Sequence, residues 1–312
     1  MARSQEDRSI LDAILQETNG LQRTLGAHDR ATVGDYLDLT TALKADRNAE
    51  VIGSVSGGVD AIQDRVASNA QERDQFARWI RSTFGPEYAK LGPPKPEDSP
   101  GTRELRANLF SLLGYRGKDP AVLAEARKIA DAYLADPSSV DPTLGQAALT
   151  VAAQSGDAVL FDKLQHVYET STDPELQHSA LELLAEFQNP ELVERALNYA
   201  VSGKVRNQDV AIQLAIALDM PESRAQAWKF IQDNWDKVLP QLTTSMGGIL
   251  VGSAGSFCST ADRDDVKSFF SSHKPPASDV ALDHAIERID GCIEFRRLQE
   301  PNLKKWLAVQ AE

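Results

Sequence analysis

Apolar residues recur at helical spacing along almost the whole chain of 312 residues, and this periodicity constrains the fold more than any other sequence feature. The segment DPAVLAEARKIADAYLAD, which begins at Asp119, carries one apolar stripe at helical spacing, formed by Val122, Leu123, Ala126, Ile129, Ala130, Tyr133 and Leu134. We find no convincing alternation of period two, which is the pattern of a half-buried strand. The sequence therefore predicts an all-α fold.

Asp-Pro or Asn-Pro dipeptides mark the starts of several periodic segments. An Asp or Asn side chain caps the first turn of a helix, and proline is tolerated at the first helical position. Segments run about 12–18 residues, so two of them make a unit of roughly 30–40 residues, the size of a helical-hairpin repeat. That spacing predicts an α-solenoid. Helix starts are predicted at Asp119-Pro120, Asp141-Pro142, Asp173-Pro174, Asn189-Pro190 and Met220-Pro221, with a further break at Gly156-Asp157.

Three segments depart from this pattern. Residues 92–101, GPPKPEDSPG, contain four prolines and no apolar periodicity, so we interpret them as a surface loop inside one array, with a domain boundary as the alternative. In SMGGILVGSAG, Gly248 and Gly252 stack on one helix face, which lets a neighbouring helix approach closely. A final helix is predicted from about Ser278 to Leu298, followed by a tail that docks through Trp306.

The formal net charge of −13 opposes binding to nucleic acids or anionic membranes. No apolar run approaches the ~20 residues that a membrane span needs, and the N-terminal residues lack the apolar core of a signal peptide. We therefore expect a soluble chain made without export, cytoplasmic by default, with neither nucleic acid nor membrane as a partner.

The chain contains two cysteines, Cys258 and Cys292, which are too few for a disulfide framework or a zinc knuckle. We interpret them as two buried thiols. A single bridge between them remains the alternative, because both lie in C-terminal helical segments that can meet in space.

A search for catalytic chemistry finds no complete motif. None of the five histidines belongs to a His-Glu-x-x-His pattern, and there is no Gly-x-Ser-x-Gly elbow or phosphate-binding loop. Asp283 and His284 with Glu287 come nearest to a metal-ligand set, and we interpret them as a solvated helix surface. We therefore predict no catalytic residue, no metal site and no cofactor in this chain.

The octapeptide SGKVRNQD, residues 202–209, separates two periodic segments. A purely structural role accounts for most of it, because Gly203 can end a helix, Asn207 or Asp209 can cap the next helix, and Val205 can anchor the turn.

Three further residues of this octapeptide, Lys204, Arg206 and Gln208, exceed what a turn requires. In an α-solenoid the connections between helices lie at the edges of the array, where such side chains can face a peptide or a partner. The alternatives of a simple turn and a contact surface both remain open.

From this octapeptide onward the sequence resembles the C-terminal helical domain of the aminopeptidase N family of zinc metallopeptidases. It is most similar to the branch that contains the puromycin-sensitive and endoplasmic reticulum aminopeptidases. A string near the N-terminus, DRATVGDYLDLTTALKADRNAEV, resembles the start of the same domain, so we assign residues 29–312 to it. The other matching strings are GKVRNQDVAIQLAIALDMPESRAQAWKFIQDNWDKV, LVGSAGSFCSTADRDDVKSFFSSHK and AIERIDGCIEFRRLQEPNLKKWL.

The resemblance implies a curved bowl of HEAT- or armadillo-like helical hairpins. In the family this bowl packs against a thermolysin-like catalytic domain, closes over the active site and helps to receive the peptide. The family's zinc-binding motif is missing here, so the resemblance implies a non-catalytic module, with zinc expected only in a catalytic domain that this sequence lacks. We predict a metallopeptidase catalytic domain or a peptide as the partner, contacted through Lys204, Arg206, Gln208 and Arg296.

Residues 1–28 do not match the family and form an amphipathic segment that is predicted to cover the first face of the array. Two other functions stay open at this point. One is a stand-alone helical-repeat scaffold that binds another protein, and the other is a complete enzyme with an unrecognised site.

Overall fold

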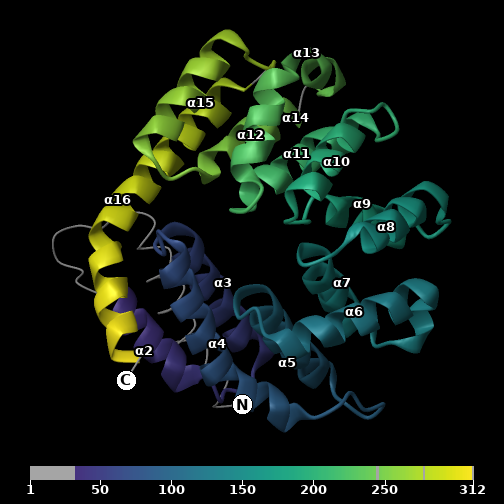
Figure 1. Ribbon diagram of the computed structural model, residues 1–312, viewed down its shortest axis with the longest axis vertical. Helices are drawn as coiled ribbons and strands as arrows, with labels where there is room; N and C mark the ends of the chain where they lie inside the picture. The colour runs from purple at the N-terminus through teal and green to yellow at the C-terminus, as the bar shows by residue number, and fades with distance from the viewer. Residues whose placement is uncertain (1–31, 244–245, 277, 311–312) are drawn as a thin grey trace, which may run out of the picture. The chain divides into compact units, whose positions relative to one another are not determined.

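The computed structural model describes residues 32–243, 246–276 and 278–310, and every regular element in these ranges is a helix (Figure 1). This confirms the predicted all-α class. The chain divides into two compact units, which we call unit 1 (residues 1–119 and 295–312) and unit 2 (residues 120–294). The predicted amphipathic segment at residues 1–28 lies outside the described residues.

Unit 1 combines the first helices of the chain with the end of the last one. Its described helices are α2 (Val33–Leu43), α3 (Ala49–Arg65), α4 (Ala70–Leu91), α5 (Pro100–Ser111), a π-helix (Leu112–Arg116) and α16 (Asp279–Gln310) from residue 295 onward.

Unit 2 contains the helices between these, together with the first half of α16. They are α6 (Pro120–Ala135), α7 (Pro142–Gln154), α8 (Ala158–Thr170), α9 (Pro174–Leu184), α10 (Pro190–Ala200), α11 (Asn207–Asp219), α12 (Arg224–Asp233), α13 (Trp235–Val238), α14 (Met246–Ser253) and α15 (Thr260–Ser272). Three short 3₁₀ turns lie at Pro137–Ser139, Leu239–Gln241 and Ala254–Ser256.

Side-chain caps account for several of the helix starts in unit 2. The side chains of Asp141, Asp157, Asp173 and Asn189 each accept a hydrogen bond of 2.9–3.1 Å from a backbone N–H in the first turn that follows. The starts predicted at Asp141, Asp173 and Asn189 are confirmed, and so is the break predicted at Gly156-Asp157. The start predicted at Met220-Pro221 is wrong, because residues 220–223 form a turn and α12 begins four residues later, at Arg224.

Two pairs of consecutive helices in unit 2 pack closely against each other, α6 against α7 and α8 against α9. At the second pair the rings of Phe161 and Phe187 lie 5.1 Å apart, and both side chains are buried. This local pairing is what a helical-hairpin repeat requires. The curved superhelical bowl stays a prediction.

The last helix is longer than expected, since α16 continues through Pro301 to Gln310 instead of ending at Leu298. Trp306 therefore docks as part of this helix. Its ring meets that of Trp79 edge-on, with centroids 5.0 Å apart, and its Nε1 donates a 2.8 Å hydrogen bond to Asp38. The predicted anchoring role of Trp306 is confirmed, and the side chain belongs to the core of unit 1.

The proline-rich stretch joins α4 to α5 inside unit 1, and its last two residues, Pro100 and Gly101, already belong to α5. Two arginines of α5 hold the connection. Arg106, whose side chain is 2% exposed, lies 2.9 Å from a carboxylate oxygen of Asp98, and Arg103 donates to the backbone oxygens of Asp98 and Pro96. The division between the units falls elsewhere, after Asp119.

The two cysteines form a disulfide between the segment before α15 and the middle of α16. Our interpretation of them as buried thiols was wrong, and the alternative holds. Helical periodicity places each cysteine within its own segment and gives no information about which segments meet.

The glycine-rich helix α14 and the 3₁₀ turn that follows it do approach their neighbours closely, through different glycines from those predicted. A Cβ at Gly255 would lie 3.0 Å from the Cα of Ala285 in α16, and a Cβ at Gly247 would lie 2.7 Å from Pro275. Positions 248 and 252 leave room for a side chain, since the nearest atom at Gly248 is 3.9 Å away and Gly252 has none within 4 Å.

Candidate functional site

The predicted contact residues Lys204, Arg206 and Gln208 lie in and just after the turn between α10 and α11 in unit 2. Helix α10 ends at Ala200, before the predicted cap at Gly203, which instead forms the turn with a φ of +83°. That conformation favours glycine because it has no Cβ. Val205 is 2% exposed and anchors the turn, as predicted.

Helix α11 begins without the expected side-chain cap. Its N-cap residue is Arg206, which makes no capping hydrogen bond, so the prediction that Asn207 or Asp209 caps this helix was wrong. Asp209 lies in the first turn instead, where a carboxylate is favoured by the helix dipole. The polar residues of the octapeptide therefore contribute less to capping the start of α11 than the sequence predicts.

Lys204 is held above the end of α8. Its ammonium lies 3.3 Å from a carboxylate oxygen of Glu169, which also accepts hydrogen bonds from Gln165 and from the hydroxyl of Tyr199. The bonds from Gln165 and Tyr199 lower the pKa of Glu169. Glu169 is therefore ionised at neutral pH and neutralises the charge of Lys204, whose side chain is 63% exposed.

Arg206 forms an ion pair within its own helix start. Its Nε donates a 2.7 Å hydrogen bond to Asp209, whose side chain is only 6% exposed, whereas the Arg206 side chain is 60% exposed. Gln208 is exposed beside this pair. The structure thus brings Lys204, Arg206 and Gln208 together on one exposed connection, with a carboxylate against each basic group.

The fourth predicted contact residue, Arg296, lies in unit 1. Its Nε donates a 2.6 Å hydrogen bond to the backbone oxygen of Arg65 at the end of α3. This bond attaches α16 to α3, so Arg296 has a structural role that the sequence did not indicate.

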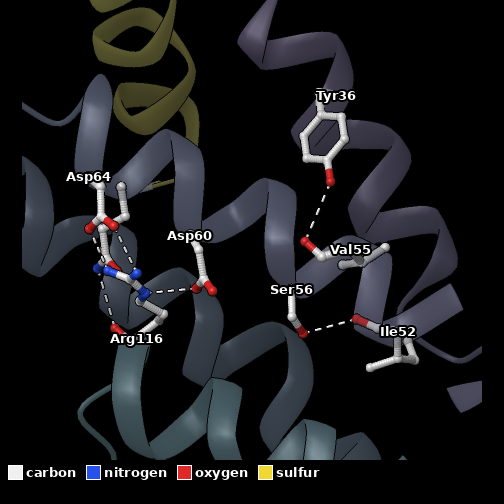
Figure 2. Close-up of polar contacts among 8 residues, drawn as sticks. Tyr36, Ile52, Val55, Ser56, Asp60, Asp64 and Arg116 are labelled. Atoms are coloured by element: carbon white, nitrogen blue, oxygen red, sulfur yellow. Dashed lines mark hydrogen bonds and ion pairs between the residues drawn. The ribbon is translucent and has the colours of Figure 1, made fainter. Parts of the chain in front are cut away.

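Sequence reasoning missed a polar cluster in unit 1 that is centred on Arg116, the last residue of the π-helix (Figure 2). The guanidinium bridges two carboxylates of α3, with Nε 2.7 Å from Asp60 and Nη2 2.9 Å from Asp64. Asp60 and Asp64 are four residues apart and share one helix face, which is visible in the sequence. The sequence does not show that their partner is Arg116, which lies 52 residues beyond Asp64.

This cluster sets one cation against two carboxylates. Arg116 is 7% exposed, while the side chains of Asp60 and Asp64 keep 37% and 26% of their surface in contact with solvent. Burial raises the pKa of Asp60, and the attraction of Arg116 opposes that rise. Nearby, Tyr36 donates a long 3.4 Å hydrogen bond to the backbone oxygen of Val55. The arrangement is one that attaches the π-helix to α3.

Within the described ranges, no group of three or more His, Cys, Asp or Glu residues is placed to hold a metal ion. Asp283, His284 and Glu287 all lie exposed on α16. No described helix combines the length and apolar character that crossing a membrane demands.

Comparison with known families bears on the whole chain. Residues 23–291 match the profile of the family described as ERAP1-like C-terminal domain. The chain belongs to this family. The matched range spans most of unit 1 and nearly all of unit 2, so the ERAP1-like C-terminal domain includes both the Arg116 cluster and the turn that carries Lys204.

Relatives of this ERAP1-like C-terminal domain are aminopeptidases. Mitochondrial aminopeptidase 2 of Saccharomyces cerevisiae is 22% identical over 91% of this chain and 30% of its own length. Aminopeptidase M1 of Arabidopsis thaliana is 29% identical over 83% of this chain and 30% of its own length. Endoplasmic reticulum aminopeptidase 1 of Mus musculus is 25% identical over 68% of this chain and 23% of its own length. The chain thus spans less than a third of these relatives.

Proposed function

We propose that this chain is the non-catalytic C-terminal module of an aminopeptidase of the aminopeptidase N family, and that it covers the active site of a catalytic domain and contacts the peptide. The observation that carries the proposal is the match of residues 23–291 to the C-terminal domain of that family. The proposal also agrees with the lack of a His-Glu-x-x-His motif in the sequence, since zinc would then be held by a separate catalytic domain.

The connection between α10 and α11 is the contact surface that we propose for the peptide. Lys204 uses one of its three N–H donors on Glu169, and Arg206 uses its Nε on Asp209. The remaining donors of these exposed side chains, with the amide of Gln208, suit the carbonyl oxygens of an extended peptide. Because each cation already faces a carboxylate, we expect recognition by hydrogen bonds rather than by net charge.

Fluorescence anisotropy with a labelled peptide library of increasing length tests this proposal on the purified chain. Lys204→Ala and Arg206→Ala should each weaken binding about 2- to 5-fold, the loss of one exposed polar contact. Lys229→Ala, which removes another exposed lysine of unit 2 that pairs with an aspartate, Asp233, is the matched control and should leave affinity unchanged. Raising the salt concentration should have little effect on binding.

Equal affinity of the Lys204 and Lys229 variants would refute the proposed surface, and a steep salt dependence would refute the proposed mode of recognition. Catalytic activity of the purified chain would refute the proposal that it is a non-catalytic module. Purified chain supplied with zinc should hydrolyse no aminoacyl substrate, and turnover that a chelator abolishes would show a complete enzyme. The alternative function, a stand-alone helical-repeat scaffold, would be favoured if the chain binds no peptide but stably binds a protein that has no peptidase domain.

A further inference from the structure

A carboxyl group and a carboxamide meet in the interior of unit 2, away from the proposed contact surface. Gln154 is the last residue of α7, and Glu186 follows the end of α9. The Nε2 of Gln154 donates a 3.2 Å hydrogen bond to a carboxyl oxygen of Glu186. Gln154 is 5% exposed, and its Oε1 is buried without a hydrogen-bond partner among the described residues.

An ionised Glu186 cannot satisfy this buried oxygen. A carboxylate only accepts hydrogen bonds, whereas a protonated carboxyl group has one O–H that donates. A buried acceptor without a donor destabilises the fold. A protonated Glu186 carries an O–H, which is the kind of donor that the Oε1 of Gln154 lacks, and its other carboxyl oxygen still accepts the bond from Nε2.

The surroundings of Glu186 also favour its neutral form. Its chain neighbours, Ala185 and Phe187, are buried apolar residues. The charged group that acts on it is Glu182, one turn earlier in α9, whose own ion-pair partner is His178 at 3.3 Å. Gln154, the polar group that faces it from α7, carries no charge. Within the described part of the chain, no Lys, Arg or His forms an ion pair with Glu186.

We propose that Glu186 and Gln154 form a proton-dependent clasp between α7 and α9, closed by two hydrogen bonds when Glu186 is protonated and reduced to one when it ionises. Burial raises the pKa of Glu186 from 4.5 to about 7, with Glu182 contributing to the rise. The clasp would therefore open and close within the range of cellular pH.

The direction of the pH effect follows from this rise. A carboxyl group whose pKa is higher in the folded than in the unfolded chain stabilises the fold fully below pH 4.5. That stabilisation is lost as the pH rises through about 7. The pKa difference corresponds to an increase of at most about 300-fold in the equilibrium constant of unfolding.

Urea unfolding between pH 4.5 and 8.5 tests the clasp in three forms of the chain. Glu186→Gln supplies an amide donor for Gln154 at every pH, so its stability should lose the wild-type fall between pH 4.5 and about 7 and exceed wild type at pH 8.5. Glu182→Gln, which neutralises the neighbouring carboxylate, is the control and should keep most of the fall. Parallel curves for wild type and Glu186→Gln would overturn the proposal.

A second measurement needs no variant. Carbon-13 NMR of the wild-type chain labelled at glutamate carboxyl groups should show one resonance that titrates near pH 7. If every glutamate resonance titrates below pH 5.5, Glu186 is ionised throughout this range and the clasp does not exist.

Discussion

The disulfide between Cys258 and Cys292 is the feature whose removal has the most calculable consequence. The two cysteines are 34 positions apart, and the loop that they close contains the whole of α15. A cross-link of this kind stabilises a fold mainly because it restricts the unfolded chain, and the effect grows with the logarithm of the loop length. For a loop of this size the chain-entropy relation gives about 4 kcal/mol at 25 °C.

The contacts around the bridge indicate that unit 2 still folds without it. Val266 and Phe270 of α15 and Ile289 of α16 are at most 1% exposed, and Arg263 pairs with Asp290 at 2.9 Å. Loss of the bridge should therefore lower the melting temperature without abolishing the transition. For a unit of this size, about 4 kcal/mol corresponds to a decrease of roughly 8–16 °C.

Differential scanning calorimetry with and without a phosphine reductant measures this decrease, and intact-mass analysis after alkylation reports how many thiols are free. Cys258→Ser with Cys292→Ser should melt at the temperature of the reduced wild type and should not respond to the reductant. The reasoning is refuted if both thiols of the wild type are alkylated and its melting temperature stays within 2 °C of the oxidised protein, a shift of less than about 1 kcal/mol.

Two further predictions concern packing. Arg116→Ala leaves Asp60 and Asp64 without their cation and should lower the free energy of unfolding in denaturant by about 2–4 kcal/mol, less than for a fully buried pair because both carboxylates are partly exposed. Adding Asp60→Asn and Asp64→Asn should restore part of this loss. A loss below about 0.5 kcal/mol would contradict this account. Gly255→Ala should lower the free energy of unfolding by about 1–3 kcal/mol because the added Cβ would meet the backbone of α16. The control Gly252→Ala, with no atom within 4 Å of the added Cβ, should stabilise α14 by about 0.5–1 kcal/mol. Equal effects of the two substitutions would contradict the assigned contacts.

Local signals in the sequence were sufficient for the helices and many of their ends. Asp141, Asp157, Asp173 and Asn189 cap the turn directly after them, so the residues that decide each start are adjacent in the chain. Proline alone is a weaker signal. Met220-Pro221 falls in a turn and does not begin a helix. In this turn the Ser223 hydroxyl donates a hydrogen bond to the backbone oxygen of Ala217, and α12 begins at the next residue, Arg224.

Contacts between distant segments account for what the sequence could not show. The pairing of Arg116 with Asp60 and Asp64, the disulfide and the close approach at Gly255 each depend on which helices become neighbours. Helical periodicity gives the buried face of a helix and leaves its neighbour open. The same limit applied to Arg296, which the sequence predicts as a contact residue and which donates a hydrogen bond to the end of α3.

The disulfide also bears on where such a chain can work. Disulfides persist in oxidising compartments and are rare in the cytosol, where thiols are kept reduced. The expectation of a cytoplasmic chain rested on the lack of export signals in the sequence, and it stays a prediction that the bridge between the two cysteines does not favour. Because the α15–α16 contact is well packed by itself, we expect the bridge to add stability to a fold that also forms when the thiols are reduced.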